Sequence, residues 1–405
     1  MSAAGPGGFV PPPYPYDRLA VAARRAAEHE GGAVDLSVGT PCDPPPPAAV
    51  AALGASGTER GYPPSVGSAA LRRSVADWVE RRFGARLDPA QVAACVGTKE
   101  FVASAAWYLS LRTPGRDTVL APAVAYPTYA MGAALARCRA VAVPERPEGG
   151  LDLGAVAEAD AERALCLWVN SPANPTGALS DLAAAAAWGR GRAVPVLSDE
   201  CYAEFTWAGA PATVVGSGTE GVVAVHSLSK RSNLAGVRVG AYAGDGELVE
   251  YLAEVRKHAG LMVPGPVQAA AVAAWDDDGH VEVQRRRYRR RLERLSEILR
   301  GAGLDAAVPA GAFYLWVPVP AWAVAEGRAR GRGGAWVLTE ALAEAGGVVV
   351  SPGEFYGDGA AGHVRVAAVQ PDERIELVAR RLAASGHPRL GPGAAPVAEA
   401  TEAGR

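Results

Sequence analysis

A single lysine, Lys230, stands among small polar residues and glycines in the stretch HSLSKRSNLAGVRVG. The apolar run before it, VVAVHS, predicts a buried strand, so Lys230 lies at or just past a strand's carboxyl end. Ligands bind at that edge in open α/β sheets. An amine near apolar groups and another cation loses proton affinity and becomes a nucleophile, whose typical covalent partner is an aldehyde. An isolated loop lysine is usually a surface residue, so the hypothesis depends on the neighbouring residues.

Two further segments have the residue types that bind a phosphate. Ser227 and Arg238 flank Lys230, and a hydroxyl and a planar guanidinium converging on one point suit a phosphate. The sequence Gly97-Thr98-Lys99 links an apolar run to a helical pattern, and the first N–H groups of a helix form an anion site. Each feature has an ordinary alternative, a solvated loop or a generic strand–helix turn, and GTK does not match a P-loop.

Polar residues follow two other apolar runs. Asp199 ends the strand pattern in VLSDECYAEF, where its carboxylate could pair with a protonated ring nitrogen. Tyr202 could donate a hydrogen bond to a phenolate oxygen. Asn174 in LWVNSPANPTG reaches the same edge. Alone, Asp199 would be interpreted as a helix N-cap and NPTG as a turn, but all these groups meet at one edge of one predicted sheet.

Short apolar runs alternate with helical patterns, and several runs, such as LCLWV, lack the alternation of a half-exposed strand. This is typical of strands covered on both faces, so we predict a doubly wound α/β domain with a mostly parallel seven-stranded sheet flanked by helices. The predicted strands are 92–96, 118–121, 140–143, 164–169, 194–197, 222–225 and 237–243, and the predicted helices are 68–82, 100–110, 126–136 and 180–189.

After residue 280 the pattern changes to a smaller α+β domain with strands at 304–308, 313–317, 348–350 and 364–367. A basic helix precedes them at 281–300. Its apolar residues fall on one stripe, which indicates an amphipathic helix with a solvated arginine face and not a nucleic-acid site. The stripe consists of Val281, Tyr288, Leu292, Leu295 and Leu299. We expect an extended arm at 1–16, a small domain at 17–50 and 285–388, a large domain at 51–284 and a disordered tail at 389–405.

The bulk composition excludes several classes of protein. A net charge of −3 over 405 residues gives no reason to expect nucleic acid or an anionic membrane as a partner. Five widely spaced cysteines without a CxxC motif argue against disulfides and zinc and favour the cytoplasm. The six histidines show no metal-binding spacing, the N-terminus has no secretory signal pattern, and no apolar run is long enough to span a membrane.

The chain resembles the fold-type I, class I/II pyridoxal-phosphate aminotransferases over about residues 17–385. The matching segments are SLSKRSNLAGVRVG, SDECY, NSPANPTG, GYPPSVGSAALRRSVADWV, APAVAYPTY, GAFYLWV and SPGEFYGDGAAGHVRVA. The resemblance implies amino-group exchange between an amino acid and a 2-oxo acid, pyridoxal 5'-phosphate as cofactor, no metal, and a homodimer with shared active sites.

By this resemblance, the catalytic residues are Lys230, Asp199 and Tyr202. Lys230 would bind the cofactor's aldehyde and Asp199 its pyridine nitrogen, while Asn174 and Tyr202 hold the phenolic oxygen and Tyr126 stacks on the ring. The phosphate ligands would be Gly97, Thr98, Lys99, Ser227, Arg238 and, from the neighbouring subunit, Tyr62. Arg365 would clamp the substrate's α-carboxylate, with help from Asn174 and the Gly39 backbone.

Within the family, VDLSVGTPCDP, DECYAEFTW and LMVPGPVQAA are most similar to actinobacterial N-succinyldiaminopimelate aminotransferases of lysine biosynthesis. Val237, in place of an expected aromatic residue, and the insert GRARGRGGAW leave open a paralogue that acts on another amino acid. A carbon–sulfur β-lyase of the same fold would keep every cofactor residue. A regulator with an aminotransferase-like sensor is disfavoured, because about 30 residues without a helix-turn-helix pattern precede the first core motif.

Overall fold

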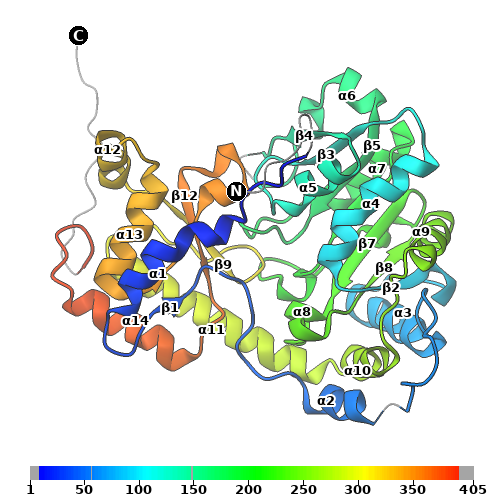
Figure 1. Ribbon diagram of the computed structural model, residues 1–405, viewed down its shortest axis with the longest axis horizontal. Coiled ribbons are helices and arrows are strands. Elements are labelled where there is room, and N and C mark those ends of the chain that lie inside the picture. The colour runs from blue at the N-terminus through cyan, green and yellow to red at the C-terminus, as the bar shows by residue number, and fades with distance from the viewer. Residues whose placement is uncertain (1–8, 56, 147–148, 392–405) are drawn as a thin grey trace.

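The computed structural model describes residues 9–55, 57–146 and 149–391. A seven-stranded sheet forms the larger part of the molecule (Figure 1). Strand β8 is antiparallel to both of its neighbours, and the other neighbouring pairs are parallel, which confirms the predicted architecture. The strand order is β2 (Val92–Cys95), β8 (Gly240–Gly244), β7 (Val222–Ser227), β6 (Val196–Asp199), β5 (Ala164–Asn170), β3 (Thr118–Pro122) and β4 (Arg139–Val143).

Helices cover both faces of this sheet, as the uninterrupted apolar runs predict. Along β5, Leu167 and Val169 pack into the core on one face and Trp168 into the core on the other, so every side chain of the run is buried. The first face packs against α2 (Pro47–Gly54), α3 (Ala69–Phe83), α7 (Leu182–Arg192) and α10 (Gly265–Trp275), and the second against α4 (Thr98–Arg112), α5 (Thr128–Leu135) and α9 (Gly246–His258).

Helix α3 shows how local sequence fixes an element's ends. Ser68 is its N-cap, and the Ser68 hydroxyl accepts a hydrogen bond from the Leu71 N–H at 3.2 Å. The helix ends at Gly84, which takes the left-handed conformation that suits glycine. This leaves Trp78, Arg81 and Arg82 on a helix with two defined ends.

A second body of structure surrounds two small sheets. One sheet has the order β11 (Ser351–Pro352), β12 (His363–Ala367) and β9 (Tyr314–Pro318), and the other pairs β1 (Val34–Asp35) with β10 (Val348–Val349). The accompanying helices are α1 (Ala20–Ala27), α12 (Ala321–Ala329), α13 (Gly334–Gly346) and α14 (Asp372–Ala384). Helix α11 (Gly279–Gly301) runs from α10 to α14 and joins the two bodies (Figure 1). The exact domain boundaries stay a prediction, and most of the predicted tail lies outside the described residues.

The apolar stripe of α11 is buried as predicted, but one arginine of the basic face is not solvated. The side chain of Arg291 is 5% exposed, and it forms ion pairs with Asp43 and Asp372, both at 2.6 Å. Arg291 therefore ties α11 to the chain that precedes α2 and to the start of α14.

Two strand predictions are wrong at particular residues. Residues 304–308 form no strand, because Leu304 and Ala306 pack into the core beside α11 while the Ala306 carbonyl accepts a bond from the Ser296 hydroxyl instead of a strand partner. Strand β8 begins at Gly240 and not at Val237, because Val237 ends a 3₁₀ turn and Arg238 has a left-handed backbone. In the described part of the chain, no helix has both the length and the apolar character needed to cross a bilayer.

Candidate active site

The carboxyl ends of β2, β5, β6 and β7 meet at one edge of the large sheet, and the antiparallel β8 begins there. This edge borders a cavity of about 280 Å³. Most of the residues predicted from the sequence line it: Gly39, Thr98, Lys99, Tyr126, Asn174, Asp199, Tyr202, Ser227, Lys230, Arg238 and Arg365. Gly97 lies directly behind Arg238, whereas the side chain of Tyr62 is 95% exposed and lies away from this cavity.

Lys230 projects from α8 (Leu228–Arg231), a single turn that continues from β7. The Ser227 hydroxyl caps this turn by accepting a bond from the Ser229 N–H at 3.1 Å. The Lys230 ammonium donates to the Gly39 carbonyl at 2.5 Å. Burial, together with the positive charges of Arg365 and Arg238, lowers the pKa of Lys230 to about 8. Near neutral pH a far larger fraction of this amine than of an ordinary lysine is therefore uncharged and nucleophilic.

The depressed pKa of Lys230 predicts how the cofactor-free protein reacts with pyridoxal phosphate. The bond-forming rate should rise with pH and level off above about pH 8, since only the neutral amine attacks an aldehyde and the usual lysine pKa is 10.5. Stopped-flow absorbance across this pH range, followed by borohydride reduction and peptide mapping, measures both the profile and the lysine that reacts.

Mapping is simple because the sequence contains three lysines, Lys99, Lys230 and Lys257. The variant Lys257→Arg is the matched control, because Lys257 is exposed and pairs with Glu254 on α9. It should give the same profile as the unmodified protein. A profile that still climbs at pH 10, or label on another lysine, would contradict the prediction.

Asp199 offers a carboxylate suited to a protonated ring nitrogen. One oxygen accepts a bond from the Tyr129 hydroxyl at 2.9 Å and the other from the Cys201 N–H at 3.2 Å. Burial raises the pKa of Asp199, so a positively charged partner in the cavity would stabilise its ionised form. Tyr129 was not predicted from the sequence, although it stands three residues after Tyr126 in AYPTY and only the fold brings it to Asp199.

The first turn of α4 fits a phosphate group. Gly97 is the N-cap of this 15-residue helix and supplies no side-chain cap, so N–H groups of the first turn are open to an anion. Gly97 has a φ of +78°, which favours glycine, and a Cβ atom there would lie 2.3 Å from Nη2 of Arg238, so a side chain at this position would displace the guanidinium. Thr98, at the same turn, has its hydroxyl 3.2 Å from the Cys201 sulfur.

Arg365 is the most deeply buried cation of the cavity, with 1% of its surface exposed. Nη1 donates to the Asn174 side chain at 2.7 Å, Nη2 donates to the Ser37 carbonyl at 2.5 Å, and Nε has no partner. The guanidinium lies 4.1 Å from the ring centroid of Tyr314, and neighbouring tyrosines raise its pKa against the opposing effect of burial. None of the described carboxylates forms an ion pair with Arg365, so an anionic ligand would complete its surroundings.

Two tyrosines before α1 complete the wall of the cavity, and neither was predicted. The Tyr16 hydroxyl accepts a bond from Nη2 of Arg365 at 3.3 Å. The ring of Tyr14 lies 5.3 Å from the Lys99 ammonium, which is also 5.6 Å from the ring of Tyr126. The signal was the pair of tyrosines in PPPYPYD, within the segment 1–16 that was predicted to be an extended arm. The hydroxyls of Tyr202 and Tyr314, which also line the cavity, are 2.8 Å apart.

Comparison with known proteins agrees with this geometry. A family model described as aminotransferase class I and II matches residues 32–382. The chain is 41% identical over 380 residues to 4-dedimethylamino-4-oxo-anhydrotetracycline transaminase OxyQ of Streptomyces rimosus, which covers 92% of this chain and 99% of that protein. It is 32% identical over 387 residues to LL-diaminopimelate aminotransferase of Dehalococcoides mccartyi, and the alignment covers 92% of this chain and 96% of that protein. A solved structure of a probable N-succinyldiaminopimelate aminotransferase from Thermus thermophilus has a TM-score of 0.78 at 32% identity. The match covers 90% of this chain and 98% of that chain.

Proposed function

Because the chain belongs to the pyridoxal-phosphate-dependent class I and II aminotransferases, we propose that it converts N-succinyl-LL-2,6-diaminopimelate and 2-oxoglutarate to N-succinyl-2-amino-6-oxopimelate and glutamate. Such a reaction belongs to lysine and diaminopimelate biosynthesis in the cytoplasm. The similarity to the Thermus structure and to the Dehalococcoides enzyme supports this choice of substrate. The relatives named above are transaminases, which does not favour the carbon–sulfur lyase.

The observation that carries the proposal is the set of unpaired cations around the cavity. Lys99, Arg238 and Arg365 all line it, and within the described residues none of them has a carboxylate partner. The expected ligands bring the cofactor's phosphate, the α-carboxylate of the substrate beside its free amino group, and two further carboxylates at the succinylated end of the substrate. Arg238 beside the first turn of α4 suits the phosphate, and buried Arg365 suits the α-carboxylate. Lys99, which the resemblance assigns to the phosphate, is exposed, and we propose that it binds the distal end of the substrate instead.

The polar residues of the cavity have separate roles in the proposed reaction. Pyridoxal phosphate, when bound, supplies an electron sink that makes the Cα–H of an amino acid acidic. Asp199 keeps the ring nitrogen protonated, and Tyr202 with Asn174 orients the ring oxygen. Arg365 fixes the α-carboxylate and thereby the direction of the Cα–H bond. Lys230, whose lowered pKa leaves it free to accept a proton, would take the proton from Cα of the substrate and deliver it to the former aldehyde carbon of the cofactor, so that the amino group stays with the cofactor.

A substrate panel tests the choice of amino acid. Purified enzyme should turn over N-succinyl-LL-diaminopimelate with 2-oxoglutarate at a kcat/KM at least about tenfold above those for aspartate and aromatic amino acids. Coupled detection of glutamate measures each rate. Failure with the first substrate together with fast turnover of another would remove this substrate and leave the aminotransferase assignment intact.

The variant Lys99→Met tests the distal subsite. For N-succinyl-LL-diaminopimelate, kcat/KM should fall about tenfold, because one charge-assisted contact is lost at a partly solvated position. For alanine, which has no distal carboxylate, it should stay nearly constant. The variant Lys257→Met is the control for loss of a surface charge. Equal losses with both substrates would instead assign the Lys99 side chain to the cofactor's phosphate.

The similarity to OxyQ favours a second candidate, an amino transfer in specialised metabolism. OxyQ shares 41% of aligned residues with this chain, and its name describes a polycyclic oxo substrate. The same panel separates the two candidates, since such an enzyme would accept an amino donor but leave N-succinyl-LL-diaminopimelate unchanged.

The proposal includes a homodimer. Tyr62 is large, aromatic and 95% exposed in the single chain, which suits a side chain that reaches the phosphate of a neighbouring subunit. Light scattering should give a mass of two chains. A mass of one chain for fully active enzyme would contradict the shared site.

A further inference from the structure

Helix α8 is too short to hold Lys230 in place by itself. It has four residues, Leu228–Arg231, and an isolated turn of this length has no helical stability in water. Leu228 is fully buried, and Arg231, the residue after Lys230, is 2% exposed. Tertiary contacts of these neighbours must therefore fix the position of the turn.

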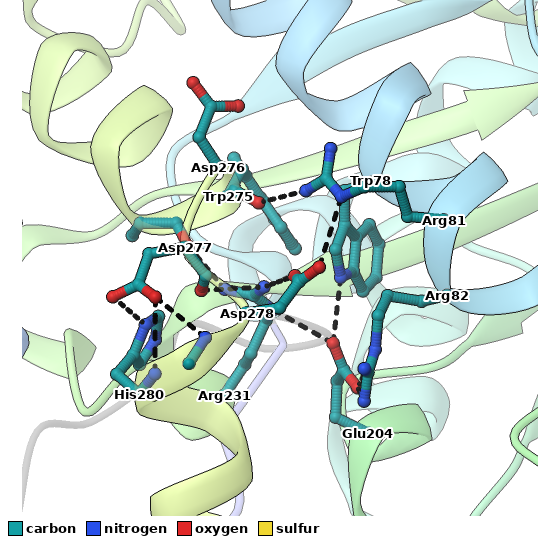
Figure 2. A network of polar contacts seen from close by, with 12 residues as sticks. Trp78, Arg81, Arg82, Glu204, Arg231, Trp275, Asp276, Asp277, Asp278 and His280 are labelled. Atoms are coloured by element: carbon teal, nitrogen blue, oxygen red, sulfur yellow. Dashed lines mark hydrogen bonds and ion pairs between the residues drawn. The ribbon is translucent and has the colours of Figure 1, made fainter.

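The guanidinium of Arg231 is bound from several directions (Figure 2). Nε donates to Glu204 at 3.2 Å, Nη2 donates to Asp278 at 3.0 Å, and Nη1 donates to the Ala274 carbonyl at 2.6 Å. Its central carbon lies 5.0 Å from the ring centroid of Trp275. These partners lie at the α10–α11 junction and after β6, so one side chain connects the turn to two other parts of the molecule.

Glu204 is the other buried end of this ion pair, with 3% of its surface exposed. It lies in the 3₁₀ turn Ala203–Phe205, two residues after Tyr202, whose side chain lines the cavity. The Trp78 indole donates to Glu204 at 2.8 Å, and Arg82 pairs with it at 2.9 Å (Figure 2). The Arg231–Glu204 contact therefore joins the segment that carries Lys230 to the segment that carries Tyr202.

The charged side chains of this cluster pair with one another. Arg231 and Arg82 share Glu204, Asp278 also pairs with Arg81, and Glu282 also pairs with Arg82 and Arg285. Four arginines thus share three carboxylates. Loss of one member leaves a buried partner uncompensated, so the geometry of the cluster is strongly constrained.

We propose that Arg231 is a positioning residue, which holds the Lys230 turn at a fixed distance from Tyr202 through its ion pair with Glu204. This inference rests on the proposed role of Lys230. The Arg231 guanidinium contacts neighbouring helices and turns and does not line the cavity. Arg231 therefore affects the reaction through the position of the Lys230 amine. Placement errors of about 1 Å can reduce a rate about 100-fold.

The variants Arg231→Gln and Arg82→Gln form a matched pair for the test. Each removes an arginine from Glu204, but only Arg231 is attached to the turn with Lys230. With the cofactor-loaded enzyme, Arg231→Gln should lower kcat by about 10- to 100-fold and change KM less than about threefold. Arg82→Gln should lower the melting temperature as well but keep kcat within about threefold. Equal loss of kcat in both variants, or none in Arg231→Gln, would overturn the proposal.

A second measurement does not depend on turnover. In cofactor-free protein, the rate at which pyridoxal phosphate becomes trapped by borohydride on Lys230 should fall about tenfold or more in Arg231→Gln and remain unchanged in Arg82→Gln. Arg231→Lys keeps the charge and protects folding, but it lacks the planar fork that reaches three partners, so it should show the same slow trapping. Normal trapping in a folded Arg231→Lys variant would overturn the proposal. Absence of trapping on Lys230 in the unmodified protein would instead refute the proposed function.

Discussion

Replacement of Lys230 by alanine should lower the rate of amino transfer by at least about 10⁴-fold, because the residue acts both as the amine that binds the cofactor and as the base that moves the Cα proton. Lys230 lines the cavity with Asp199 and Arg365, and its lowered pKa suits a proton acceptor near neutral pH. Single-turnover absorbance of cofactor-loaded protein mixed with substrate measures the proton-transfer step directly.

Lys257→Ala is the control for this experiment. Lys257 lies near the end of α9, where it pairs with Glu254 at 3.4 Å and both side chains are more than half exposed. Its loss should leave the single-turnover rate within about twofold, since an exposed ion pair of this kind contributes little. Both variants should bind pyridoxal phosphate in the cavity, but only the control should yield a borohydride-stable adduct. A Lys230→Ala enzyme with ordinary turnover would remove Lys230 from the centre of the reaction.

Replacement of Arg365 by alanine should lower kcat/KM for α-amino acids by about 10²- to 10³-fold. The expected loss is that of a buried, charge-assisted contact to the α-carboxylate, about 3–4 kcal/mol. Arg365 lies in the cavity with Asn174 on one side and an unpartnered Nε. Steady-state kinetics with an amino acid and with the corresponding amine that lacks a carboxylate measures the effect.

The comparison between the two substrates is the internal control for Arg365. The unmodified enzyme should strongly prefer the amino acid, and Arg365→Ala should lose most of that preference while turnover of the plain amine changes little. Arg365→Lys keeps a cation without the planar fork and should recover only part of the preference. If Arg365→Ala retained full discrimination, another group would have to bind the α-carboxylate.

Much of this site could be predicted because a parallel sheet sorts residues by position. Once the apolar runs are recognised as buried strands, residues just past their ends, such as Asp199 and Lys230, must lie at one edge. The strand boundary before Gly240 was wrong because a left-handed residue, Arg238, ends the turn, and no residue type at that position signals it. The buried apolar side chains at 304–308 pack against a helix instead of extending a sheet.

The remaining contacts are set by tertiary structure and have no local pattern. Tyr16 and Arg365 are 349 residues apart. Glu204 and Arg231 meet only because the fold brings the 3₁₀ turn after β6 next to α8. Tyr129 reaches Asp199 from a helix on one face of the sheet. In each case the sequence contains a plausible polar residue, but its partner depends on how the helices pack.

Because two tyrosines that line the cavity precede α1, truncation of the amino-terminal segment would alter the active site. A shortened chain that starts at residue 17 would keep the cores on the two faces of the large sheet and the core of the second body, since these three are built from later residues, and it would be expected to fold. It would nevertheless lack Tyr14 and Tyr16, and with them one wall of the reaction chamber. Purification tags are therefore better joined to the opposite end of the polypeptide.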